Sequence, residues 1–276
     1  MKKVSHVVLL CVASLAGSQV VRETMQLGPG DRTATQAVQI ARRFLGSFGV
    51  ESTDSDFQVG AVGGKGWRCS VVPENGKTSH VVYVTASTGH VSLYNNVARE
   101  DAMRTRDTPA SQDRIRDLQT AEREATKVLG RVLPAGHTLR KSPAVIKAKT
   151  GAKDSRVVSK RVDGLIQGFP VVDVNYGAWI VLDALDGAVI SYSANWIEPT
   201  PQVEYVAPKL TKAQVLAQFA HPDFSYDAEL GWATKPGASK ARLCWRIVST
   251  PKPGTGRVAS GVDTYVDAAT GQKHHD

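Results

Sequence analysis

The residues best suited to chemistry form a basic run at positions 140–161, which holds eight Lys or Arg residues against one acid. Within it, VIKAKTGAKDSRVVSKRV (145–162) predicts a hairpin. Period-two alternation places four of its cations in two pairs, each pair on one face: Lys147 with Lys149, and Arg156 with Lys160. Such a face could attract an anionic envelope polymer or an acidic protein. It could also be a solvated face that keeps the sheet edge soluble.

The acidic residues offer a second set of candidates. Asp183 and Asp267 each precede a turn that contains Gly, where a calcium site is one conceivable use for them. Calcium needs about five or more oxygen ligands, whereas one such turn offers two at most. We therefore expect no metal and no cofactor. An enzyme that uses scattered acids stays open as an alternative, with Asp173, Asp183 and Asp263 as its candidate residues.

The familiar catalytic patterns do not occur in the sequence. It has no GxSxG elbow, no HExxH and no CxxC. GAVGGK (60–65) is one residue too short for a phosphate-binding loop, and Gly66 stands where Ser or Thr is needed. This stretch therefore predicts a turn between two strands. Since no catalytic constellation is recognisable, we expect a protein that is not an enzyme.

Three similar stretches end in glycine, namely YVTASTGHV (83–91), IVLDALDGAV (180–189) and YVDAATGQK (265–273). A hairpin that has a type I turn followed by a left-handed residue puts Gly last, since another residue pays about 1–2 kcal/mol in that conformation. Asp side chains beside such a turn can accept hydrogen bonds from backbone amides. We therefore assign a structural turn role to five residues: Gly89, Gly187, Gly271, Asp183 and Asp267.

A predicted helix stands ahead of each of these glycines. The distances to the glycine are 56, 67 and 60 residues, counted from Thr33, Thr120 and Thr211, which are the expected N-cap residues of the three helices. The first and third helices have Gln three residues after the Thr, which is a capping-box pattern. Residues 171–184 then alternate between apolar and polar, as in an antiparallel sheet that is covered on one face. Trp179 falls on the uncovered face. A helix followed by a hairpin, written three times, indicates an internal repeat.

On these residues the chain resembles the PepSY domain and its relatives, which occur in secreted bacterial proteins and peptidase propeptides. YVDAATGQK (265–273) is similar to the family's closing strand V-D-A-x-T-G-x-V, and GFPVVDVNYGAWIVLDALDGAVISYSANW (168–196) is similar to the repeated PepSY-like domains of envelope proteins. The first repeat departs from the pattern, with Thr85 where the others have Asp. The resemblance implies a non-catalytic module that inhibits or assists peptidases or binds envelope components, and it implies no catalytic residues.

The N-terminus predicts export. Met1-Lys2-Lys3 is a basic start, Val7–Ala16 is apolar, and small residues follow at 16–18. We expect a signal peptide at 1–18, cleaved near residues 16–18, and a secreted or periplasmic protein; a buried first strand is the alternative. About ten apolar residues are too few to span a membrane, which takes about 20. Cleavage would remove Cys11. The two cysteines left, Cys69 and Cys244, could form a disulfide or be two separate buried thiols.

The net charge of +8 is local. Residues 99–161 hold 16 Lys or Arg and 8 Asp or Glu, whereas the segments before and after carry +3 and −3 and cancel. A nucleic-acid-binding protein would combine such charge with a helix-turn-helix, a finger or a stacking platform. The sequence shows none of these motifs, so we expect no nucleic-acid partner.

Together these features predict an α+β fold of three tandem small units, each with one helix packed on one face of an antiparallel sheet. The units are expected at 20–98, 119–198 and 209–276, with a linker at 99–118. The expected function is an exported, non-catalytic binding or peptidase-inhibitory module of the cell envelope. The alternatives are an envelope enzyme and a purely structural spacer.

Overall fold

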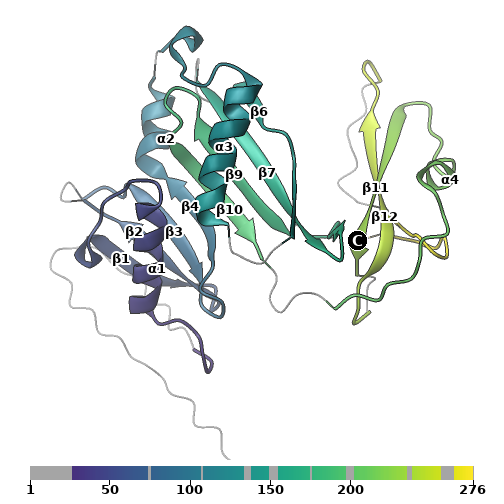
Figure 1. Cartoon of the computed structure of the whole chain (residues 1–276), viewed down its shortest axis with the longest axis horizontal. Coiled ribbons are helices and arrows are strands. Elements are labelled where there is room, and N and C mark those ends of the chain that lie inside the picture. Colours follow the sequence, from purple (N-terminus) through teal and green to yellow (C-terminus); the bar gives the residue numbers. More distant parts are fainter. Residues whose placement is uncertain are drawn as a thin grey trace, which may run out of the picture. The chain divides into compact units, whose positions relative to one another are not determined.

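The chain forms two compact bodies, drawn in the computed structural model of Figure 1. The large body comprises residues 1–135, 142–161 and 178–196, and the small body comprises 136–141, 162–177 and 197–276. The structure describes residues 27–73, 76–106, 108–133, 138–148, 155–174, 176–196, 202–234, 238–255 and 264–275. The predicted signal peptide at 1–18 lies outside these residues.

Antiparallel strands dominate the chain, and the first ten belong to a single sheet. Its order is β1-β2-β3-β4-β10-β9-β7-β5, and β6 and β8 also pair with β7. The strands are β1 Phe57–Val62, β2 Gly66–Val71, β3 His80–Thr85, β4 Val91–Asn96, β5 Thr138–Lys141, β6 Val145–Ala148, β7 Arg156–Ile166, β8 Phe169–Pro170, β9 Gly177–Asp183 and β10 Val189–Asn195.

The predicted fold class of three tandem units is wrong, because the first two repeats share this sheet. Strand β4 closes the first hairpin and β10 closes the second, and the two pair directly. Tyr94 lies opposite Tyr192, flanked by the pairs Asn95–Ser191 and Leu93–Ser193. Each hairpin alone would leave its last strand with unpaired backbone groups, and pairing the two edges satisfies both. The domain boundaries expected from the sequence remain a prediction.

Helices cover both faces of the sheet within the large body (Figure 1). Helix α3 (Leu118–Val132) contacts β7 through Glu122 and Lys160, whereas α2 (Val97–Arg104) packs Met103 against Val157 of the same strand. An odd spacing along a strand points two side chains to opposite faces, so α2 and α3 lie on opposite sides. Helix α1 (Ala34–Gly46) packs against β1 to β4. Helix α2 occupies part of the segment that the sequence analysis assigned to a linker.

The helix starts show how local sequence fixes these elements. Thr33 and Thr211 form full capping boxes at α1 and at α4 (Lys212–Leu216), as the sequence predicts. The expectation that Thr120 caps the second helix is wrong. The N-cap there is Asp117, whose carboxylate accepts hydrogen bonds from the backbone amide and the hydroxyl of Thr120. Asp is among the most favourable N-cap residues and ranks above Thr, so the helix begins after Asp117 rather than after Thr120.

The small body contains a four-stranded antiparallel sheet. Its strands are β11 Phe224–Ala233, β12 Arg242–Pro251, β13 Thr264–Asp267 and β14 Lys273–His275, in that order. Val215 of α4 packs with Ala228, Ile247 and Val266 of this sheet. Trp232 is buried on β11, and its indole donates a 2.6 Å hydrogen bond to the backbone oxygen of Ile166. In this body the short helix α4 therefore packs on the antiparallel sheet.

Candidate functional site

The three glycine turns have the same backbone hydrogen bonds. Gly89, Gly187 and Gly271 have φ angles of 74°, 80° and 76°, in the left-handed region. Each donates its amide to the backbone oxygen four residues earlier, at 2.8 to 2.9 Å. The residue before each Gly accepts a bond from the amide that follows it, through Thr88, Asp186 or Thr270. The recurrence in the sequence therefore corresponds to one recurring turn.

Asp183 is the most heavily engaged side chain of these turns. Its fully buried carboxylate accepts hydrogen bonds from Arg99 at 2.8 Å and from both terminal nitrogens of Arg106 at 2.9 and 2.6 Å. The amide of Leu185 donates a further bond. Burial alone would raise the pKa of Asp183, but these hydrogen bonds and the two positive charges outweigh it, so the pKa is lowered. Asp183 is thus held ionised as the anchor of the segment that contains α2.

The basic residues predicted to bind an anionic partner fall into different surroundings. The side chain of Lys160 is only 1% exposed and binds Glu122 and the backbone oxygen of Ser142. The hydrogen bond from Lys160 is the main reason that the pKa of Glu122 is lowered. Arg156 forms a 2.6 Å ion pair with the largely buried carboxylate of Asp113. Both cations are therefore paired with carboxylates of the large body, and Lys160 is buried whereas the Arg156 side chain stays 29% exposed.

Lys147 is the exposed member of the described set, and Lys149 lies outside the described residues. The amino group of Lys147 lies 5.8 Å from the ring centre of Trp179. Trp179 is 46% exposed, as the alternation predicts, because the side chains before and after it in the strand are buried on the opposite face. This geometry is a cation–π contact, and the binding of an anionic partner by the basic residues stays a prediction.

The acids of the enzyme alternative have structural partners. Asp173 accepts a 2.7 Å hydrogen bond from the amide of Thr234, and Asp183 is bound as described above. Asp263 lies outside the described residues. Within the part of the chain that the structure describes, no group of three or more His, Cys, Asp or Glu side chains could hold a metal ion.

The two cysteines within the described residues, Cys69 and Cys244, are separate buried thiols and do not form a disulfide. Burial raises the pKa of Cys69 to about 12. This corresponds to the second of the two arrangements that the sequence leaves open.

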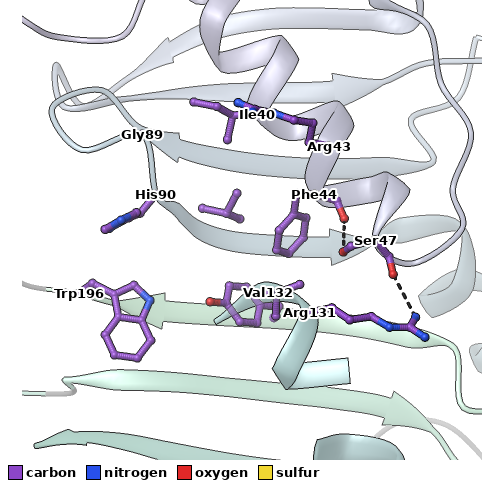
Figure 2. Close-up of a pocket in the computed structure, with 11 residues that line it drawn as sticks. Ile40, Arg43, Phe44, Ser47, Gly89, His90, Arg131, Val132 and Trp196 are labelled. Atoms are coloured by element: carbon purple, nitrogen blue, oxygen red, sulfur yellow. Dashed lines mark hydrogen bonds between the residues drawn. The ribbon is translucent and has the colours of Figure 1, made fainter. Parts of the chain in front are cut away.

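A pocket of about 380 Å³ lies between α1 and the end of α3, above β4 and β10 (Figure 2). All of it belongs to the large body. Its apolar lining comes from four elements and the residue after β10: Ile40, Phe44, Val91, Val132, Tyr192 and Trp196. Its other lining residues are Arg43, Ser47, Gly89, His90 and Arg131. A concave apolar surface with a few polar groups is the usual form of a binding site.

Aromatic packing and one hydrogen bond hold the pocket in shape. The ring of Phe44 lies 5.4 Å from that of Tyr192 and 5.6 Å from that of Tyr94. At one end Arg131 donates a 3.1 Å hydrogen bond to the backbone oxygen of Ser47, which joins the C-terminal ends of α1 and α3 (Figure 2). The sequence analysis missed this pocket, because only the pairing of β4 with β10 brings Phe44 beside Tyr192.

Within the described residues, no helix is both long enough and apolar enough to cross a bilayer.

Comparisons with known proteins give similarity of fold. No family model and no curated protein matches the chain. The C-terminal domain of Bacillus megaterium YpeB aligns over 89% of this chain and 97% of its own, with 18% identity and a TM-score of 0.47. An uncharacterised protein from Eubacterium rectale aligns over 86% of this chain and 80% of its own, with 10% identity and a TM-score of 0.51. The second similarity shows that the two proteins share a fold, and nothing about function follows from it.

Proposed function

We propose that the chain is a non-catalytic, PepSY-like module of the cell envelope that binds a partner protein through the pocket of the large body. The pocket carries this proposal, because it combines an aromatic floor with arginines on two different helices. Aromatic residues and Arg are enriched at protein interfaces, and Trp, Tyr and Arg are enriched among the few residues that carry most of the binding energy.

The family part of the proposal is supported by sequence. The closing strand YVDAATGQK (265–273) is similar to the PepSY pattern, and the same turn recurs at Gly89 and Gly187. Placement in the envelope is supported by the basic and apolar N-terminal pattern of residues 1–18. Peptidase inhibition is the form of binding that the family resemblance suggests, and the identity of the captured partner would test it.

Site-specific photo-cross-linking in producing cells tests the binding role. A photoreactive phenylalanine at Ile40, which lines the pocket, should give one discrete adduct with another protein. The matched control is the same probe at Leu118, an apolar residue that is 62% exposed and does not line the pocket. Identical adducts from both positions, or none from Ile40, would contradict binding at the pocket. Mass spectrometry of the adduct would show whether the partner is a peptidase.

A further inference from the structure

The charged residues that line the pocket are all positive among the residues that the structure describes. Its lining includes the cations Arg43 and Arg131, and none of its described lining residues is Asp or Glu. Both arginines stand in the last turns of their helices, where the backbone contributes about half a negative charge per helix. Two full positive charges exceed this. The pocket is therefore an apolar site with a net positive edge, and its complement is an apolar group that carries a negative charge.

Arg43 is the arginine whose guanidinium can still pair with a carboxylate of a ligand. Its Nε donates a long, 3.4 Å bond to the backbone oxygen of Gln39, and no carboxylate of the described residues pairs with it. Its sequence neighbour Arg42 is different, because it forms a 2.9 Å ion pair with Asp54. Arg131 is also different, since it is used to join the two helix ends through Ser47.

Figure 2 shows how the cation and the apolar floor are placed. The side chain of Arg43 runs along the α1 side toward Ile40, above the ring of Phe44. A ligand that fits must present a negative group and an apolar group a short distance apart. In the last residue of a peptide, the carboxylate and the side chain leave the same Cα atom. An Arg guanidinium can bind such a carboxylate through two parallel hydrogen bonds.

We infer that the pocket binds the C-terminal end of a partner polypeptide whose last side chain is large and apolar. The terminal carboxylate pairs with Arg43, and the side chain lies on Phe44, Tyr192 and Trp196. This inference rests on the proposed function and specifies the part of the partner that enters the site.

Fluorescence anisotropy with labelled tetrapeptides tests it on the purified chain. A peptide that ends in Leu with a free carboxylate should bind saturably. Its C-terminal amide should bind about ten- to a hundredfold more weakly, because a hydrogen bond to a charged group is lost. A peptide that ends in Ala should bind about tenfold more weakly, because apolar contact is lost.

Variants assign the effect to the pocket. Arg43→Gln should reduce the affinity for the free acid to the level of the amide and leave the affinity for the amide unchanged. Arg42→Gln, on the same helix but paired with Asp54, is the matched control and should change neither. Ile40→Glu should abolish binding of every peptide. Since Arg43 is exposed and Ile40 partly exposed, both variants should melt within a few degrees of the unmodified chain.

Each other outcome overturns the inference in a distinct way. Equal binding of acid and amide would refute recognition of the carboxylate. Saturable binding of a fatty acid such as palmitate, with no peptide binding, would make a lipid the occupant. If no peptide binds while the Ile40 cross-link still captures a protein, the C-terminal inference fails and the proposed function stands. If neither is seen, both fail.

Discussion

The turn at Asp183 and the turn at Asp267 have the same backbone, but different surroundings. In both, the carboxylate accepts a 3.0 Å hydrogen bond from the amide two residues later, at Leu185 and at Ala269. Asp183 then also binds Arg99 and Arg106, which belong to the α2 segment. The Asp267 carboxylate instead accepts a second amide of its own turn. The comparison shows that the repeated motif determines the local bend, and that the inserted α2 segment determines what the acid is used for.

The largest difference between the two turns should come from removing the charge. Asp183→Asn leaves the partly buried Arg106 without its carboxylate, so we expect a loss of about 3 kcal/mol of stability in β9 and β10. Asp267→Asn keeps an oxygen for the backbone amides, so we expect about 1 kcal/mol in β13 and β14. Hydrogen exchange followed by mass spectrometry reads the two regions separately. Equal losses would show that the arginines add nothing to the Asp183 turn.

Replacement of the turn glycines should have a smaller effect. Gly187→Ala puts a side chain at positive φ, and its Cβ would come within 2.0 Å of the Arg114 guanidinium. We expect a loss of about 2 kcal/mol, compared with about 1 kcal/mol for Gly271→Ala, whose Cβ would lie 3.2 Å from Leu210. Gly130→Ala, in the last turn of α3 with open space around it, is the control and should stabilise the chain slightly. Thermal melting measures all three, and a loss at Gly130 equal to that at Gly187 would refute the turn assignment.

The smallest expected effect is a change with pH in the stability difference between the unmodified chain and Asp183→Asn. The pKa of Asp183 is lowered from its ordinary value of 3.8, so its contribution to stability is present above that value and is lost as the pH falls through the folded pKa. The stability gap between the unmodified chain and Asp183→Asn should therefore narrow below about pH 4. Urea unfolding at about pH 6 and about pH 3 measures the gap. A gap that stays constant would mean that ionisation of Asp183 is not what stabilises the turn.

Features set by neighbouring residues could be predicted from the sequence. Three features all depend on a few adjacent side chains: the left-handed glycines, the capping boxes at Thr33 and Thr211, and the strands before and after the turn at 63–65. The second helix shows the limit of this reasoning. Asp117 and Thr120 are both able to cap, and only the backbone conformation at Asp117 shows which one does.

Features set by distant pairing could not be predicted. Nothing in the alternation of β4 or β10 says which strand lies beside it, so the joined sheet and the pocket above it were out of reach. The surroundings of the basic run could not be predicted for a related reason. Lys160 looks like a surface cation in sequence, but its strand position places it under α3, where Glu122 neutralises it. A partner that is 38 residues away leaves no local signal.

The pairing of β4 with β10 also affects the order in which the chain folds. Tyr94 and Tyr192 are opposite each other in the sheet but 98 positions apart in the chain. Closing so long a loop is entropically costly and is associated with slow folding. During synthesis the first hairpin therefore exists for a period with the edge of β4 bare, and we expect this nascent intermediate to be the species most exposed to misassembly or to capture by a chaperone.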